Sequence, residues 1–142
     1  MIALGCDHAG LALKEEVKNF LDELKVTYKD FGTYTTDSVD YPDTVAPPCD
    51  AVLNGECEKA LLFCGTGVGI SIAANKISGI RACVCSDAFS AKYSRRHNDA
   101  NVLCLGGRVV GVGLAYELVQ IFLSTEFEGG RHTARVEKLN SL

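Results

Sequence analysis

Short apolar runs recur along the chain and are separated by longer segments with spaced apolar residues. The runs cover residues 2–6, 60–64, 80–85 and 102–105, and apolar and polar residues alternate over 26–31. Short apolar runs are typical of strands buried on both faces, whereas alternation indicates a strand with one exposed face. The pattern therefore predicts five strands.

Helical periodicity fills the segments between these strands. Spacings of three and four residues predict amphipathic helices after the first strand and after the last one. The first stripe consists of Leu13, Val17, Phe20, Leu21 and Leu24, and the last consists of Leu114, Leu118, Ile121 and Phe122. Further helices are expected from the glycine turn after residue 64 through residue 76, and over residues 88–96.

The remaining segments are more polar. Residues 32–43 are expected to form a loop. The helical pattern after this loop contains Pro47 and Pro48, which a helix interior does not tolerate. That helix is therefore expected to begin near the prolines, or to kink there, and to continue to about Asn54. In the tail, Arg131 and Arg135 are four residues apart and so share one helical face.

Strands that alternate with helices indicate a parallel sheet covered on both faces. The 142 residues suffice for one domain with a hydrophobic core. We therefore expect one doubly wound, Rossmann-like α/β domain over residues 1–142, with a five-stranded parallel sheet in the order 2-1-3-4-5. In such sheets the ligand binds beyond the carboxyl ends of the strands, where the strand order reverses. That point lies between Asp7-His8, after strand one, and Cys64, at the end of strand three.

Composition narrows the classes of function. Hydrophobic residues make up 47% of the chain and charged residues 23%, which excludes a disordered protein. The net charge of -4 argues against a nucleic-acid partner, because binding the phosphate backbone needs a basic face. The N-terminus resembles a first strand rather than a signal peptide, and no apolar run approaches the roughly 18 residues that span a bilayer. A cytoplasmic protein without a membrane partner is expected.

The seven cysteines are odd in number, and no Cys-x-x-Cys occurs. Most are expected to be buried thiols in a reducing compartment. Zinc sites have clustered ligands at characteristic spacings, and the sequence has none. No metal is therefore expected.

Cys64 is followed by the turn Gly65-Thr66-Gly67-Val68-Gly69, which opens a predicted helix. Glycines let a backbone approach a ligand closely, and the free N–H groups at a helix start attract anions. The same turn also suits close packing without a ligand, and its spacing matches neither a Walker loop nor a dinucleotide fingerprint. Cys64 itself is either a packed thiol or a base whose thiolate the helix N-terminus stabilises.

Other polar residues have similarly open interpretations. Asp7 suits a helix cap, and Asp7-His8 also suits proton transfer near the glycine turn. His97-Asn98 is expected between a helix and the fifth strand, where histidines are often merely exposed. Three arginines are either surface charges or a guanidinium cluster that binds a phosphate. They are Arg108, Arg131 and Arg135.

Together these motifs resemble the ribose-5-phosphate isomerase B family, which includes the galactose-6-phosphate isomerase subunits and allose-6-phosphate isomerase. The resemblance covers essentially the whole chain, and the block from Cys64 to Lys76 is long and specific. The other landmarks are Gly5-Cys6-Asp7-His8, Asp40-Tyr41-Pro42, Gly79-Ile80-Arg81-Ala82, His97-Asn98, Gly106-Gly107-Arg108 and Gly129-Gly130-Arg131-His132.

The resemblance implies a cofactor-free aldose–ketose isomerase that interconverts ribose 5-phosphate and ribulose 5-phosphate. It makes Cys64 the base that moves a proton between C2 and C1, and it assigns ring opening to His97 with Asp7. It implies that the enediolate oxygens are bound by the Thr66 hydroxyl and by the backbone of Gly65, Thr66, Gly67, Val68, Gly69 and Ile70. It implies that the phosphate is bound by His8, Arg108, Arg131 and Arg135. The sugar hydroxyls would be bound by Tyr41 and Asn98.

This chain departs from some relatives at two places. Some relatives carry a glutamate where this chain has Ile70 and use that acid as the base, so the resemblance places this chain in the cysteine type. The Pro47-Pro48 pair is unusual for the family, but it lies away from every matched functional position.

The position of His97 also bears on assembly. A residue that precedes the fifth strand lies at the amino edge of the sheet, whereas Asp7 and Cys64 lie at the carboxyl edge. A two-fold dimer would bring His97 of one subunit to Cys64 of the other. The resemblance likewise implies homodimers, which in the family often pair into tetramers, with active sites shared between subunits.

Two other functions stay open at this point. A hexose 6-phosphate, such as allose or galactose 6-phosphate, would need the same chemistry in a pocket of different length. The galactose enzyme divides its catalytic residues between two different subunits, whereas this chain has the full set. A phosphosugar-binding module without catalysis would be expected to lack the base or the ring opener.

Overall fold

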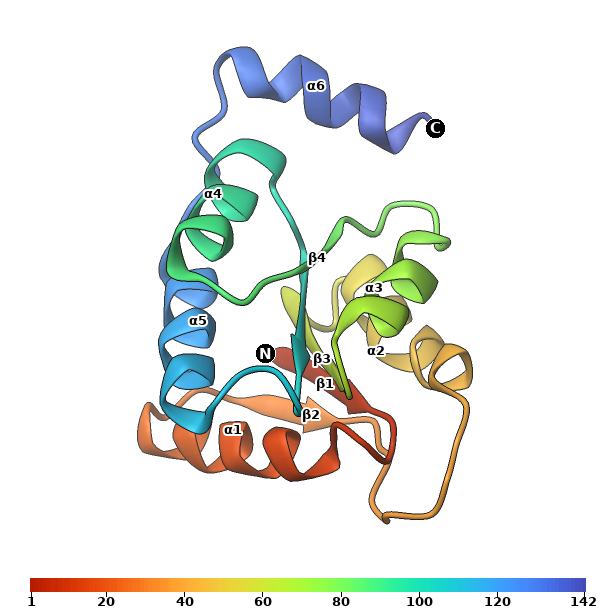
Figure 1. Ribbon diagram of the computed structural model, residues 1–142. Coiled ribbons are helices and arrows are strands. Elements are labelled where there is room, and N and C mark those ends of the chain that lie inside the picture. The colour runs from red at the N-terminus through yellow and green to blue at the C-terminus, as the bar shows by residue number, and fades with distance from the viewer.

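Five parallel strands form one sheet in the computed structural model, which describes residues 1–142 (Figure 1). The strands are β1 (Ile2–Cys6), β2 (Tyr28–Asp30), β3 (Lys59–Cys64), β4 (Ala82–Val84) and β5 (Val102–Gly106). β2 and β4 are shorter than predicted. Helices cover both faces of the sheet, which confirms the predicted doubly wound α/β class.

The strand order is β2-β1-β3-β5-β4, so the predicted order 2-1-3-4-5 is wrong for the last two strands. β5 pairs with β3, and Leu103 lies opposite Leu61 in this register. All five residues of β5 are buried, whereas β4 has three residues and ends in the exposed Val84. The strand that is buried on both faces takes the inner place, and the short strand with an exposed residue takes the edge.

The helices are α1 (Leu11–Glu23), α2 (Ala46–Leu53), α3 (Val68–Asn75), α4 (Ala88–Asn98), α5 (Val112–Ser124) and α6 (Arg131–Asn140), and a 3-10 helix η1 spans Tyr41–Thr44. α2 starts with Pro47 and Pro48 in its first turn, as predicted. α4 runs past its predicted end, so His97 and Asn98 lie in its last turn rather than in a loop. The helix ends at Asn98, and its C-cap residue Asp99 has a φ of +46°.

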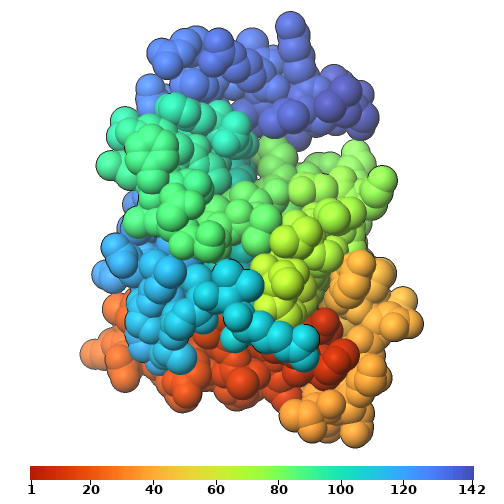
Figure 2. All heavy atoms as spheres, in the orientation of Figure 1, coloured from red at the N-terminus to blue at the C-terminus, as the bar shows by residue number.

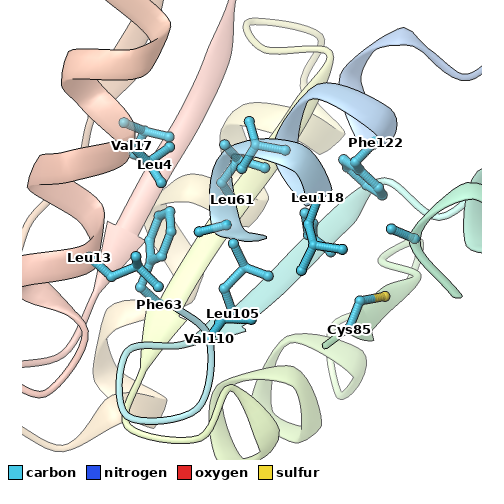
Figure 3. Close-up of a cluster of buried hydrophobic side chains, with 14 of the residues drawn as sticks. Leu4, Leu13, Val17, Leu61, Phe63, Cys85, Leu105, Val110, Leu118 and Phe122 are labelled. Atoms are coloured by element: carbon cyan, nitrogen blue, oxygen red, sulfur yellow. The ribbon is translucent and has the colours of Figure 1, made fainter. Parts of the chain in front are cut away.

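Side chains of β3 alternate between the two faces of the sheet. Leu61 and Phe63 point into a core cluster shared with α1, α4 and α5 (Figure 3). Leu62 and Cys64 point into a second cluster shared with α2 and α3. This period of two is that of an extended strand, so Cys64 ends β3 on the face that α3 covers.

A buried lysine ties α1 to the chain after β2. Lys14 is 0% exposed, and its Nζ donates to Asp30 Oδ1 at 2.7 Å and to the Thr33 carbonyl at 2.6 Å. Lys18 Nζ donates to the other oxygen of Asp30 at 3.0 Å. Because a buried ammonium without partners is very unfavourable, these contacts fix the start of the loop that leads to η1.

α6 packs on α4 at the end of the molecule opposite the carboxyl ends of the strands (Figure 1). Figure 2 shows α6 crossing the surface at that end, whereas the segment after β5 lies at the surface beside the start of α3. The carboxyl edge and α6 are therefore separate places on one chain. None of the helices is both long enough and apolar enough to cross a membrane.

Candidate active site

Cys64 lies at the carboxyl end of β3, where the strand order reverses between β1 and β3. Its side chain is buried, and the Gly67 N–H donates a hydrogen bond to its Sγ at 3.0 Å. Gly67 has a φ of +79°, and a Cβ there would lie 2.9 Å from the Val84 side chain. Only glycine suits this position, and it directs its N–H at the sulfur.

The start of α3 presents further donors beside Cys64. The N–H groups of Gly69 and Ile70 make no hydrogen bond within the chain, as expected for the first turn of a helix. The Ile70 side chain points into the core and is 0% exposed, so only its backbone faces the turn. Thr66 Oγ1 accepts the Val68 N–H at 3.2 Å, which leaves the hydroxyl hydrogen free to donate. The turn therefore combines several donors with the positive end of a helix dipole.

Arg108 lies over the glycine turn. The N–H of Gly107 donates to the Cys64 carbonyl at 2.8 Å, and the N–H of Arg108 donates to the Gly65 carbonyl at 2.9 Å. A Cβ on Gly65 would lie 3.5 Å from Arg108 Nη1. The segment after β5 thus holds an exposed guanidinium close to the turn.

Asp7 and His8 face this site from the end of β1. Asp7 is 6% exposed, and its Oδ1 accepts the N–H groups of Ala9 at 2.9 Å and Gly10 at 3.0 Å. These bonds close a turn before α1, whose N-cap is Gly10 and has no side-chain cap bond, so Asp7 does not form the helix cap that the sequence offered as one interpretation. His8 Nδ1 accepts the Val39 N–H at 3.2 Å, so the neutral imidazole carries its proton on Nε2. His8 thus offers a hydrogen-bond donor.

Tyr41, the first residue of η1, packs against the same turn. A Cβ on Gly69 would lie 2.7 Å from the Tyr41 ring. The ring therefore rests on the Gly69 backbone and is 39% exposed. One chain thus gathers one group of predicted residues around the turn, namely Asp7, His8, Tyr41, Cys64, Arg108 and the segment from Gly65 to Ile70. We call this group the thiol half-site.

The other predicted residues lie at the opposite end of the chain. His97 and Asn98 are in the last turn of α4, and Arg131 and Arg135 are exposed on α6, which packs on α4 (Figure 1). This placement confirms that His97 lies at the amino edge of the sheet. Within one chain the predicted pairing of His97 with Asp7 does not form. We call His97, Asn98, Arg131 and Arg135 the imidazole half-site.

Two residues beside His97, Glu128 and His132, had no role assigned from the sequence. The ring of His132 stacks on the ring of His97, with centroids 4.1 Å apart and planes 14° apart. Glu128 Oε2 lies 3.8 Å from His97 Nε2 and 3.4 Å from Arg96 Nη2. Desolvation lowers the pKa of His132, and the nearby charges of His97 and Arg131 lower it further. Glu128 and His132 are four residues apart, on either side of the start of the last helix. This spacing was the only signal of them in the sequence.

Comparison with known proteins places this geometry in a family. Residues 2–139 match the family described as Ribose/Galactose Isomerase. Ribose-5-phosphate isomerase B of Escherichia coli (strain K12) is 50% identical over 141 residues, which cover 99% of this chain and 95% of that relative.

Solved structures agree over the same length. The structure of Clostridium thermocellum ribose-5-phosphate isomerase B is 51% identical with a TM-score of 0.96, covering 99% of this chain and 95% of that one. The Thermotoga maritima ribose 5-phosphate isomerase is 46% identical with a TM-score of 0.97, covering 99% and 97%. Sequence and fold match from end to end, and the chain belongs to the ribose/galactose isomerase family.

Proposed function

We propose that this protein is an aldose–ketose isomerase that interconverts ribose 5-phosphate and ribulose 5-phosphate through an enediolate. The observation that carries the proposal is the Gly67 N–H on Cys64 Sγ, beside the free N–H groups of Gly69 and Ile70. A carbon acid needs a base close to it and fixed donors where negative charge develops, and this turn supplies both. The whole of residues 1–142 then serves as one isomerase domain.

The chemistry follows from the donors around the sulfur. The Cys64 thiolate takes the proton from C2 of the open-chain aldose, and the C–H electron pair forms the enediolate. The backbone N–H groups and the Thr66 hydroxyl bind the two oxygens while the O2 proton passes to O1. The thiol then returns its proton to C1, which gives the ketose and restores the thiolate. The reaction needs no net oxidant and no cofactor.

The phosphate is bound by groups from both half-sites. His8 donates from Nε2, because Val39 occupies its Nδ1, and Arg108 adds a charge above the turn. Arg131 and Arg135 complete the clamp, and Tyr41 and Asn98 bind sugar hydroxyls. A dianion held far from C1 and C2 uses binding energy to position the reacting carbons.

Ring opening needs both half-sites together, so we propose a homodimer with shared active sites. His97 would protonate the ring oxygen of a furanose held at the partner's Cys64, while the partner's Asp7 contributes from its free oxygen. Exposed apolar side chains beside the thiol half-site support a two-fold contact; Ile72 on α3 is 57% exposed and Phe89 on α4 is 71% exposed. Val68 on α3 and Val84 on β4 extend this surface. Dimers could pair further into tetramers through other surfaces.

We also propose that the protein is cytoplasmic. All seven cysteines are free, and six of them are buried. Such thiols persist where glutathione and thioredoxin keep a compartment reduced. Sugar phosphates are also charged metabolites that do not cross membranes unaided, which places the substrate in the same compartment.

A hexose 6-phosphate isomerase is the second candidate, because the family description names galactose beside ribose. The test is an activity panel with ribose 5-phosphate, allose 6-phosphate and galactose 6-phosphate, each with and without chelator. We expect ribose 5-phosphate to have the highest kcat/KM. A higher kcat/KM for either hexose phosphate would replace the pentose assignment.

Cys64→Ala separates the enzyme from a phosphosugar-binding module. The isomerase should lose turnover of every substrate yet still bind ribose 5-phosphate in calorimetry. Cys57→Ala, at a buried cysteine outside the half-sites, is the matched control and should keep full turnover. A Cys64→Ala variant with unchanged turnover would rule out the thiol as base.

A further inference from the structure

His97, Glu128 and His132 form a cluster of metal-ligand residues outside the thiol half-site. Each offers one ligand atom, and these atoms all lie within 4.8 Å of one another. The three residues come from the end of α4, the segment before α6 and the first turn of α6. The fold therefore brings His97 to Glu128 and His132, which lie far from it in the sequence, so the complete ligand set was not visible as a spacing pattern.

His132 supplies a second observation at the same place. Its side chain is 5% exposed, and its Nε2 is the only fully buried side-chain nitrogen or oxygen without a hydrogen-bond partner. Buried polar atoms in folded proteins are almost always partnered, so this unpartnered ring nitrogen is a candidate ligand atom for an ion. Desolvation already lowers the pKa of this histidine, and a neutral imidazole is the form that binds metal.

The donor set selects the class of ion. Two imidazoles and one carboxylate are a common ligand set of zinc sites with an open fourth position. Calcium and magnesium prefer oxygen ligands, so this set disfavours them. Zinc–nitrogen bonds are about 2.0–2.1 Å long, so the ligand atoms must converge from their present separation. The side chains of His97 and Glu128 are 35% and 38% exposed and can turn, whereas His132 is held by burial.

Nearby cations limit the affinity of such a site. Arg96 Nη2 lies 3.4 Å from Glu128 and must release the carboxylate, and Arg131 raises the local positive potential. These charges disfavour a permanently bound ion and favour a reversible one. A reversible ion on His97 would compete with the use of that imidazole in acid–base chemistry.

We propose that His97, Glu128 and His132 bind one zinc ion per chain, and that this ion inhibits the enzyme by withdrawing His97 from ring opening. The inhibitory part rests on the proposed function of His97. The binding part does not, because it depends only on the three ligand atoms and the unpartnered nitrogen.

Direct binding of zinc to the chelator-treated protein tests the site. Calorimetry should find one zinc ion per chain in the wild type. Glu128→Gln removes one ligand, and its affinity should fall at least about tenfold, since even supporting residues around metals change affinity by that much. Glu126→Gln, at an exposed neighbouring glutamate, is the matched control and should bind zinc like the wild type. Equal affinity in Glu128→Gln and the wild type would overturn the site.

Zinc could instead bind the thiol of Cys64, and cobalt distinguishes the two places. Cobalt bound by nitrogen and oxygen should show no sulfur-to-cobalt charge-transfer band, and Cys64→Ala should keep the binding. A strong charge-transfer band that disappears in Cys64→Ala would assign the ion to the thiol half-site and overturn the proposal. His132→Asn provides a second ligand variant, and it too should lose affinity.

Inhibition is measured on both substrates of the proposed reaction. Zinc should slow turnover of cyclic ribose 5-phosphate more than turnover of open-chain ribulose 5-phosphate, and Glu128→Gln should need at least about tenfold more zinc for the same effect. Equal inhibition of both substrates, in the wild type and in Glu128→Gln, would overturn the regulatory role. If the protein turned over neither substrate, the proposed function would fail, while calorimetry would still decide the metal site.

Discussion

The N–H of Gly67 donates a hydrogen bond to the Sγ of Cys64 at 3.0 Å. The donor opens α3 and the sulfur ends β3, so one turn both positions the thiol and directs a dipole at it. This contact depends on a backbone conformation with φ of +79° that a residue with a side chain rarely adopts. The proposed base is therefore set up by the backbone, and no second ionisable side chain is needed beside it.

Gly67→Ala tests this dependence. The new Cβ would meet Val84 and force the turn to shift, so the N–H would leave the sulfur. We expect kcat to fall about 10²-fold, the usual loss when one pre-organised donor is removed. Steady-state kinetics with ribose 5-phosphate measure this at a temperature where the variant is folded.

Gly55→Ala is the control for backbone strain. Gly55 has a similar φ of +83°, but nothing lies within 4 Å of its would-be Cβ. Both variants should lose about 1–2 kcal/mol of unfolding free energy from the left-handed conformation. Only Gly67→Ala should lose kcat, and equal kcat in the two variants would contradict the role of the turn.

His97→Asn should separate ring opening from proton transfer. The amide keeps a polar group of similar size but cannot exchange a proton near neutral pH. Turnover of ribose 5-phosphate should nearly vanish, whereas turnover of ribulose 5-phosphate should be largely kept. Losses of equal size in the two directions would argue against a dedicated ring-opening residue.

Arg135→Ala should chiefly raise KM. A charge-assisted hydrogen bond contributes about 1.5–3 kcal/mol, so KM for ribose 5-phosphate should rise roughly 10- to 100-fold. Uniform loss of phosphate binding affects KM more than kcat. Lys138→Ala, also exposed on α6, removes the same charge and should leave KM unchanged. An unchanged KM in Arg135→Ala would remove this residue from the phosphate clamp.

Asp30→Asn should destabilise the fold without touching either half-site. The substitution leaves Lys14 buried with its ionic partner removed, and breaking such a pair costs about 3–5 kcal/mol. Asp50→Asn, at an exposed position of α2, should change the unfolding free energy by less than about 0.5 kcal/mol. Urea unfolding measures both, and similar stabilities would contradict the importance of the buried pair.

The same aspartate predicts how stability depends on pH. Burial raises the pKa of Asp30, but hydrogen bonds from Lys14, the Gly32 N–H and Lys18 outweigh it and hold the pKa below its ordinary value of 3.8. A lowered pKa in the folded state adds stability above the unfolded value, and this stability is lost as pH falls through the folded value. Between about pH 5 and pH 2, the wild type should therefore lose more stability than Asp30→Asn. Parallel pH profiles would contradict this assignment.

Apolar periodicity predicted the fold class because the sheet is buried on both faces by amphipathic helices. It misplaced β4 and β5 because both are short runs of similar composition, and only tertiary packing decides which one pairs with β3. The buried ammonium of Lys14 was also hidden, since a lysine on a helical stripe is usually exposed. Its partners come from β2 and the loop beyond it, and local pattern carries no such information.

The sequence predicted that Asp7, His8 and Cys64 meet at the glycine turn because they lie at the ends of strands that finish at one edge of the sheet. The cluster of His97, Glu128 and His132 could not be predicted in this way. It depends on how α6 returns to pack on α4, which is a contact between segments far apart in the sequence. The sequence also placed His97 correctly at the far edge, because that conclusion needs only the direction of a parallel strand.

The central claim is that one active site takes its thiol from one subunit and its imidazole from the other. Mixing inactive Cys64→Ala with inactive His97→Asn under conditions that exchange subunits tests it most directly. Half of the randomly mixed dimers would be mixed, each with one intact site of two, so activity on ribose 5-phosphate should return to about one quarter of wild type. If each chain carried its own complete site, the mixture would stay inactive, and that result would contradict the account.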